Sequence, residues 1–230
     1  MIKVNKVSKK IGNNEINRNI TIDIKEKGIY GILGPNGAGK TTLIRQIMGF
    51  IKPSFGEITL NGINPWNNSQ VLMQDVGYVA GEVILFDELT GKEYLDFIKS
   101  FKNIDQNKYF EELLIKFNLE NDLKTKIKNM SKGTKQKVAI VSALINKPKI
   151  LILDEPTSGL DPLMQNIFNE EIKYLINLGT TVLMCSHIFE EIKKLCDEIG
   201  FLKNGEIIKE IKISEYNVED MEKDFLSLYK

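Results

Sequence analysis

The stretch Gly34-Pro35-Asn36-Gly37-Ala38-Gly39-Lys40-Thr41 has the form G-x-x-x-x-G-K-[ST], and it decides how the rest of this 230-residue chain is expected to fold. Residues 28–33 form an apolar run that predicts a buried strand before it, and residues 42–48 form an amphipathic run that predicts a helix after it. Between a strand and a helix, the glycines let the backbone curl, so that successive N–H groups and the helix N-terminus point at a polyphosphate. The alternative is a glycine-rich turn that matches the pattern by chance, and the two flanking elements argue against it.

We expect this phosphate loop (P-loop) to bind a nucleotide together with Mg²⁺. The Lys40 ammonium would reach the β- and γ-phosphates, and the Thr41 hydroxyl would hold the metal ion. The other residues expected to contact the nucleotide here are Gly34, Pro35, Asn36, Gly37, Ala38, Gly39 and Thr42.

Composition predicts a folded cytoplasmic protein and argues against two classes of partner. Hydrophobic residues make up 42% of the chain, which is enough to build a core. Lys plus Arg and Asp plus Glu number 31 each, so no charge bias favours nucleic acid or an anionic membrane surface as the main partner. The apolar stretches fall far short of the roughly 20 residues that cross a bilayer, and residues 1–5 do not begin a secretory signal. Cys185 and Cys196 lack metal-ligand spacing and are expected to be packing residues.

The hydrophobic pattern of the first half predicts a mixed sheet with a helical insertion. Short antiparallel strands are expected within residues 1–28, with a turn at Asn13-Asn14, and a strand at 57–60 is expected after a turn at 53–56. From about residue 81 to 129 apolar residues recur at helical spacing, which predicts a helical subdomain inserted into the core. The apolar stripe of this subdomain is interpreted as core packing or, in part, as a docking surface.

Strand and helix patterns alternate in the second half, which predicts βαβ units and a parallel sheet. The predicted elements are a strand at 149–153, a helix at 163–178, a strand at 180–185 and a helix at 189–195. Asn204-Gly205 is expected to join residues 199–202 and 207–209 in a hairpin. A terminal helix is expected at 219–230, with no second domain behind it.

Two carboxylates, Asp154 and Glu155, end the apolar run Ile150-Leu151-Ile152-Leu153. Buried acids are costly unless a cation or hydrogen bonds compensate them. We expect Asp154 to help hold Mg²⁺ and Glu155 to polarise the water that attacks a γ-phosphate. These acids could merely begin a surface loop, but the preceding P-loop favours the functional interpretation.

Three further segments connect the P-loop to one family. Met130-Ser131-Lys132-Gly133-Thr134-Lys135-Gln136-Lys137 resembles the signature motif written LSGGQ, and Ser158-Gly159-Leu160-Asp161 resembles a D-loop. His187 follows the strand-like run 181–185 at the place of a switch histidine, although a lone histidine is ordinarily a packing or surface residue. In this order, from residue 1 to about 210, the chain resembles the ATP-binding cassette (ABC) ATPases.

The resemblance implies an α/β fold of the P-loop NTPase class. It has a mixed or parallel sheet core, an antiparallel N-terminal sheet and an inserted helical subdomain. The implied boundaries are 1–215 for the cassette, about 81–133 for the helical subdomain and 216–230 for a short helical tail. The implied catalytic residues are Lys40, Glu155 and His187.

The resemblance also implies a dimer. The P-loop of one copy and residues 131–134 of the other, with Ser131 and Gly133 as contacts, would enclose one ATP with its Mg²⁺. The Ser131 hydroxyl and backbone N–H groups at a second helix N-terminus would stabilise γ-phosphate charge that ADP lacks, so ATP would favour the closed pair.

Within the family, the chain resembles single-cassette subunits of bacterial exporters for drugs, antibiotics or peptides. The resemblance rests on the lysine at position 132 and on the ending Lys223-Asp224-Phe225-Leu226-Ser227-Leu228-Tyr229. It implies a separate membrane permease that docks near residues 81–101, and therefore a cassette held at the cytoplasmic face of the membrane.

Two positions depart from the family pattern. Gly81 stands where a glutamine usually contacts Mg²⁺ and the attacking water, and the neighbouring Glu82 is a candidate substitute. Ile11 stands where an aromatic ring commonly stacks on adenine. An aliphatic side chain gives up a stacking contribution of about 1 kcal/mol, so weaker discrimination among nucleotides is expected.

Two rival functions stay open at this point. A cassette protein that acts on ribosomes or DNA would usually carry a second fused cassette or a long coiled-coil insertion, and this sequence has neither. A regulatory module that scarcely hydrolyses ATP is suggested by Gly81, whereas Glu155 and His187 argue for turnover.

Overall fold

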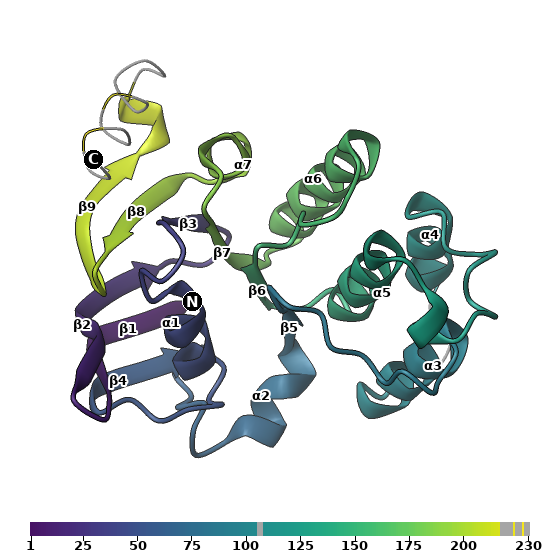
Figure 1. Ribbon diagram of the computed structural model, residues 1–230, viewed down its shortest axis with the longest axis horizontal. Helices are drawn as coiled ribbons and strands as arrows, with labels where there is room; N and C mark the ends of the chain where they lie inside the picture. Colours follow the sequence, from purple (N-terminus) through teal and green to yellow (C-terminus); the bar gives the residue numbers. More distant parts are fainter. Residues whose placement is uncertain (105–107, 217–222, 224–226, 228–230) are drawn as a thin grey trace.

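The computed structural model describes residues 1–104, 108–216, 223 and 227, and Figure 1 shows how their helices and strands are arranged. The strands are β1 (Ile2–Ile11), β2 (Asn14–Ile24), β3 (Ile29–Leu33), β4 (Phe55–Leu60), β5 (Val76–Val79), β6 (Ile150–Asp154), β7 (Thr181–Ser186), β8 (Glu198–Lys203) and β9 (Glu206–Lys212). The α-helices are α1 (Lys40–Ile47), α2 (Ser69–Asp75), α3 (Gly91–Phe101), α4 (Lys108–Lys116), α5 (Lys132–Leu144), α6 (Pro162–Asn177) and α7 (Phe189–Leu195). Short 3-10 turns cover Ile127–Asn129 and Ile213–Glu215.

Two sheets build the core. One is antiparallel in the order β2-β1-β4, and the other has six strands in the order β5-β6-β7-β3-β8-β9. In the larger sheet β5, β6, β7, β3 and β8 run parallel, while β9 pairs antiparallel with β8. The predicted mixed sheet, the antiparallel N-terminal strands and the hairpin at Asn204-Gly205 are therefore confirmed.

The six-stranded sheet is covered on both faces, which explains why its central strands are apolar throughout. All residues of β3, β6 and β7 are buried, as expected for parallel strands between two layers. Ile150 and Ile152 pack with α1 and the antiparallel sheet, whereas Leu151 and Leu153 pack with the helices of the other face. The two cores thus follow from the twofold alternation of side chains along one strand.

The helical subdomain forms the side of the molecule away from the antiparallel sheet (Figure 1). Helix α5 packs against β5 and also against α3 and α4, so it joins this subdomain to the core. Within the described residues, no helix is long and apolar enough to cross a membrane.

Three secondary-structure predictions need correction. Residues 55–56 belong to β4 and not to a turn, because Phe55 pairs with Ser8 of β1, and Gly56, at φ 81°, lies at the register irregularity between this pair and the pair Asn5–Glu57. The segment 81–90 is not helical, since a capping box at Thr90 and Glu93 starts α3 only at Gly91. Helix α2 was not predicted. The predicted terminal helix 219–230 and the tail 216–230 lie outside the described residues, apart from Tyr216, Lys223 and Ser227.

Candidate nucleotide-binding site

The sheet order brings the predicted site residues to one edge. Strand β3 lies beside β7, with Leu33 opposite Ser186, and β7 lies beside β6, with Cys185 opposite Asp154. Since these strands are parallel, the P-loop, Asp154 and His187 all leave the sheet at its carboxyl edge. Ligands of open α/β sheets bind at this edge.

The P-loop backbone has a shape that requires glycine at its end. Gly39 has φ 107°, and a Cβ at this position would lie 2.6 Å from Asn17 Nδ2 and 2.8 Å from the Ile16 carbonyl oxygen. Asn17 is fully buried and donates to the Gly39 carbonyl over 3.2 Å, and its own oxygen accepts a hydrogen bond from Gln46 over 2.8 Å. Strand β2 therefore supports the P-loop through the hydrogen bond from Asn17 to Gly39, which was not predicted from the sequence.

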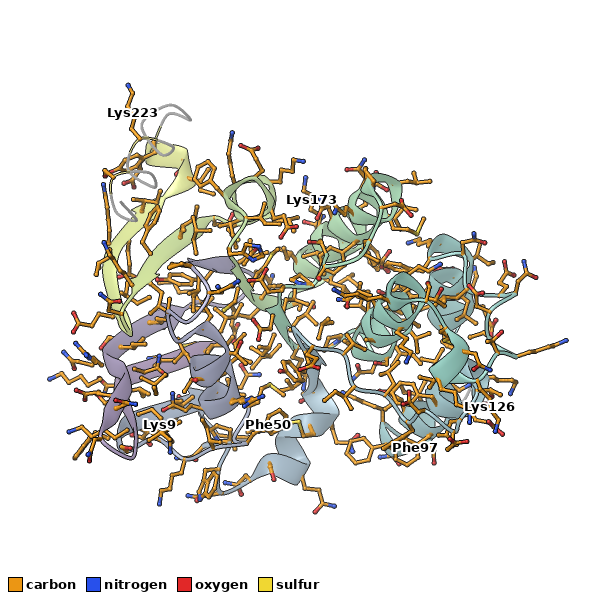
Figure 2. The ribbon with its side chains drawn as sticks, in the orientation of Figure 1. Lys9, Phe50, Phe97, Lys126, Lys173 and Lys223 are labelled. Atoms are coloured by element: carbon orange, nitrogen blue, oxygen red, sulfur yellow. The ribbon has the colours of Figure 1, made fainter. Side chains whose placement is uncertain are left out.

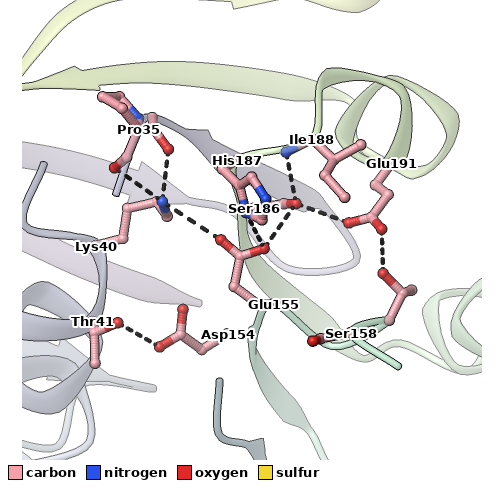
Figure 3. Close-up of polar contacts among 12 residues, drawn as sticks. Pro35, Lys40, Thr41, Asp154, Glu155, Ser158, Ser186, His187, Ile188 and Glu191 are labelled. Atoms are coloured by element: carbon pink, nitrogen blue, oxygen red, sulfur yellow. Dashed lines mark hydrogen bonds and ion pairs between the residues drawn. The ribbon is translucent and has the colours of Figure 1, made fainter. Parts of the chain in front are cut away.

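The Lys40 side chain folds back into its own loop. Its Nζ donates to the carbonyl oxygens of Gly34 over 2.6 Å and Pro35 over 3.2 Å, and it lies 3.5 Å from Glu155 Oε1 (Figure 3). The side chain is 7% exposed, so its charge is held at the base of the loop by these oxygen atoms. A polyphosphate in the loop would meet a cation already placed there.

Thr41 and Asp154 form the pair that fits a magnesium ion. The Thr41 hydroxyl donates to Asp154 Oδ2 over 2.8 Å, and Asp154 Oδ1 is buried with no hydrogen-bond partner among the described residues. Burial raises the pKa of Asp154 above its ordinary value, while the hydrogen bond from Thr41 acts in the opposite direction. The described chain has no group of three or more His, Cys, Asp or Glu side chains that could hold a metal. A hydroxyl and one carboxylate suit Mg²⁺, which usually takes its other ligands from water and phosphate.

Glu155 and His187 meet directly beside Lys40. Glu155 Oε2 lies 2.8 Å from His187 Nδ1 and 3.2 Å from Ser186 Oγ (Figure 3). Its Oε1 is buried, has no hydrogen-bond partner in the part of the chain that the structure describes, and lies 3.5 Å from Lys40 Nζ. His187 is half exposed, so it can also contact a ligand.

The P-loop, Asp154 and Glu155 border a cavity of about 530 Å³. Its lining consists of Ile16, Pro35, Asn36, Gly37, Gly39, Lys40, Thr41, Thr42, Arg45, Tyr78, Ala80, Gly81, Glu82, Ile84, Asp154 and Glu155. Arg45, Tyr78 and Ile84 were not predicted as site residues, although Arg45 lies one helical turn after Thr41, on the same face of α1.

Six of the predicted site residues are not part of this lining: Gly34 and Ala38 belong to the P-loop, His187 contacts Glu155, and Ile11, Ser131 and Gly133 lie elsewhere. Of the described residues, Ile16 and not Ile11 lines the cavity, and Ile11 is 56% exposed at the end of β1. Ser131 instead caps α5 by accepting from the Thr134 N–H over 3.1 Å. Gly133 lies against the D-loop, because a Cβ there would be 2.8 Å from the Gly159 carbonyl oxygen. One chain thus assembles the P-loop with both carboxylates and leaves the signature segment outside this cavity.

Comparisons with known proteins agree with this arrangement. The family model described as ABC transporter matches residues 17–158. The lantibiotic transport ATP-binding protein SrtF of Streptococcus pyogenes is 34% identical, with 96% of this chain and 95% of SrtF covered. The bacitracin transport ATP-binding protein BcrA of Bacillus licheniformis is also 34% identical, with 92% of this chain and 69% of BcrA covered.

A solved structure shows the same fold. The dimeric bacterial ABC transporter cassette MJ0796 is 29% identical, with a TM-score of 0.83, and the alignment covers 93% of this chain and 99% of MJ0796. The same cassette is also known as a dimer in a post-hydrolysis state bound to ADP and phosphate. The family match, the relatives and the shared fold together show that this chain belongs to the ABC transporter family as one of its ATP-binding, ATP-hydrolysing subunits.

Proposed function

We propose that two copies of this chain bind two ATP molecules between them, and that hydrolysis drives the export of a peptide or antibiotic through a separate membrane permease. One observation carries the proposal. The P-loop, Asp154 and Glu155 line one cavity, whereas Ser131 and Gly133 of the same chain do not. A head-to-tail partner would supply that missing segment.

The proposed chemistry follows from the contacts around Glu155. An ionised carboxylate can only accept hydrogen bonds, so His187 Nδ1 must carry the hydrogen of the 2.8 Å contact. That hydrogen bond orients the Glu155 carboxylate, which we propose accepts a proton from the attacking water. Lys40, at the base of the P-loop, stabilises the charge of the β- and γ-phosphates. We further propose that the half-exposed His187 contacts the γ-phosphate.

Thr41 and Asp154 are the proposed Mg²⁺ ligands. When bound, the ion would neutralise phosphate charge during transfer. Asp154 Oδ1 supports this assignment, because a carboxylate oxygen buried without a hydrogen-bond partner among the described residues is costly unless a cation compensates it. The Thr41–Asp154 hydrogen bond keeps the two oxygen ligands together.

The N-terminus of α5 supports the proposed dimer. Ser131 caps this 13-residue helix, so the positive end of the helix dipole lies at the signature segment. In a head-to-tail pair this end would face the γ-phosphate bound to the partner. Since ADP lacks that phosphate, ATP would stabilise the closed pair more than ADP does.

Exposed aromatic side chains on the helical subdomain support a docking surface for the permease. Phe86 and Phe97 are 55% and 51% exposed, and the centroids of their rings lie 5.8 Å apart in an edge-to-face arrangement. Phe97 points outward at the edge of the subdomain (Figure 2). Large exposed apolar groups of this kind mark protein contacts. Docking there would place the cassette at the cytoplasmic face of a membrane.

ATP hydrolysis measured against protein concentration tests the proposal, with Glu155→Gln as the variant. Specific activity should rise with concentration, because two chains form each site. Glu155→Gln should lose at least about 100-fold in kcat, since the amide cannot accept the proton of the water, and should still bind ATP. Thr41→Ala should weaken Mg²⁺ binding, so that hydrolysis requires a higher Mg²⁺ concentration.

Three results would contradict parts of the proposal. Specific activity independent of concentration would exclude sites shared between two chains. A Glu155→Gln variant as active as the wild type would exclude Glu155 as the base. ATP binding without turnover, with or without a permease, would favour the regulatory alternative suggested by Gly81.

A further inference from the structure

We propose that Glu191 is a positioning residue for ATP hydrolysis, because it ties together the two loops that carry Glu155 and His187. The inference rests on the proposed role of Glu155 as the base. It adds a residue that lies behind the site and does not line the nucleotide cavity.

Glu191 makes two hydrogen bonds through its two carboxylate oxygens. Oε2 accepts from the Ser186 hydroxyl over 2.8 Å (Figure 3), and Oε1 accepts a hydrogen bond from the Thr157 hydroxyl. Ser186 is fully buried and Thr157 is 4% exposed, so both hydroxyls need a partner inside the protein. Glu191 satisfies both of them.

The two hydroxyls belong to different loops of the site. Ser186 ends β7 and directly precedes His187, whereas Thr157 lies two residues after Glu155, beyond the end of β6. Glu191 comes from the first turn of α7, four residues after His187. Its carboxylate therefore joins three segments that diverge at the carboxyl edge of the sheet. Their separation sets how His187 meets Glu155.

The Ser186 hydroxyl has two possible hydrogen-bond acceptors, the carboxylates of Glu191 and Glu155. Ser186 Oγ lies 2.8 Å from Glu191 Oε2 and 3.2 Å from Glu155 Oε2, and it accepts a hydrogen bond from the Ile188 N–H over 3.0 Å. A hydroxyl has one hydrogen to donate. The shorter distance favours Glu191, which leaves His187 as the donor to Glu155 Oε2. In this way Glu191 also selects the hydrogen-bond partner of the base.

The local backbone gives this tie a further purpose. Glu155 has φ 48°, an uncommon conformation for a residue with a side chain, and its N–H donates to the Cys185 carbonyl over 2.9 Å. Such a conformation persists only when surrounding contacts hold it. The contacts from Glu191 to Thr157 and Ser186 hold both sides of this turn.

The test compares Glu191→Gln and Glu191→Ala with Glu190→Gln, a matched control on the same helix. Glu190 is exposed and pairs with Lys193 at 3.5 Å. A glutamine has one acceptor oxygen and an NH₂ donor, so it cannot accept both hydroxyls as the carboxylate does. Small displacements of catalytic groups cost much activity, so we expect kcat to fall at least about 10-fold in both Glu191 variants. Affinity for a non-hydrolysable ATP analogue should change less than about twofold, and Glu190→Gln should match the wild type.

Two further measurements separate positioning from a loss of folding. Glu191→Gln has nearly the volume of the wild-type residue, and its thermal midpoint shows whether the fold is kept. In the Thr157→Val, Ser186→Ala background, adding Glu191→Gln should lower kcat less than about twofold, because the groups through which Glu191 acts are already gone. Equal losses in both backgrounds would overturn the proposal. So would a kcat of Glu191→Gln equal to that of the wild type.

The outcomes also distinguish this inference from the proposed function. If Glu155→Gln is inactive and Glu191→Gln is fully active, only the inference fails. If Glu155→Gln is as active as the wild type, the base assignment fails, and the role of Glu191 fails with it.

Discussion

At the residue scale, Gly81 lies against Asp154, at the position where the family resemblance led us to expect a glutamine. A Cβ at position 81 would lie 3.3 Å from the Asp154 carboxyl carbon and from its Oδ2, which is closer than ordinary packing allows. Glycine therefore leaves room for the Asp154 carboxylate at the cost of a polar side chain. The next residue, Glu82, lines the nucleotide cavity and is exposed. Its carboxylate is the nearest acidic replacement along this segment.

We predict that Glu82→Ala lowers ATP turnover strongly, by about 10-fold or more in kcat, because the variant removes a carboxylate that lines the nucleotide cavity. Glu82→Gln should retain more activity, since its amide oxygen can still accept a hydrogen bond. Glu88→Ala is the control, because Glu88 is 73% exposed and pairs with Lys126 and Lys128 away from the cavity. Steady-state hydrolysis measures all three, and an unchanged rate in Glu82→Ala would remove Glu82 from the mechanism.

At the scale of elements, the end of α3 is fastened to the core by one lysine. Lys102 follows α3, and its Nζ donates to the carbonyl oxygens of Met73 over 2.8 Å and Val76 over 2.7 Å, where α2 gives way to β5. Gln74 adds a second link, since its amide donates to the Phe101 carbonyl over 3.0 Å. These bonds join the helical subdomain to the strand that leads to Gly81.

We predict a pH dependence of stability from Lys102, because burial lowers its pKa from 10.5 to about 8. Between these values the unfolded chain binds a proton that the folded chain has released, so this group makes the free energy of unfolding rise as the pH increases. Below about pH 8 both states are protonated, and the contribution is constant.

Urea unfolding of the wild type and of Lys102→Met measures this effect. The difference in unfolding free energy should move in favour of the wild type between about pH 8 and pH 10. Lys108→Met is the control, because the Lys108 side chain is 92% exposed. If the difference in unfolding free energy between the wild type and Lys102→Met does not change with pH, burial does not lower the pKa of Lys102.

At the scale of the whole molecule, the cassette presents two different working edges. The carboxyl edge of the large sheet carries the nucleotide site, and the outer edge of the helical subdomain carries the exposed Phe86 and Phe97. Helix α5 packs on both the subdomain and β5, with Ser131 at its N-terminus. A partner that moves the aromatic edge would therefore also move the signature segment.

We predict that Phe97→Ser weakens binding to the permease and leaves basal hydrolysis by the isolated cassette within about twofold of the wild type. Burying a phenylalanine contributes about 1.5–3 kcal/mol, so affinity should fall at least about 10-fold. Leu178→Ser is a matched control, because Leu178 is 55% exposed at the end of α6, outside the helical subdomain. Co-purification with a polytopic membrane protein measures binding. Equal losses in both variants would exclude a specific aromatic docking surface.

Local patterns were sufficient for much of the fold. The predicted helix at 189–195 coincides with α7, and the apolar runs before the P-loop and before Asp154 became β3 and β6. Both cysteines are buried, as predicted. These predictions succeeded because the patterns behind them, periodic burial and glycine-rich loops, are each set by a few neighbouring residues. The irregularity of β4 at Gly56 could not be predicted in this way, since it arises from pairing with β1 about fifty residues earlier.

The sequence by itself determined the chemical inventory of this protein: a P-loop lysine and threonine, two carboxylates after an apolar strand, a single histidine, and a signature segment. Only the tertiary structure decided which of these groups meet. The strand order β6-β7-β3 places Asp154 beside Thr41 and Glu155 beside His187. Packing of β2, from the antiparallel sheet, against α1 brings Asn17 to the P-loop, and helix α7 brings Glu191 behind the base. These contacts depend on which strands become neighbours. Burial of the whole sheet sets the strand order, and no short stretch of residues encodes that order.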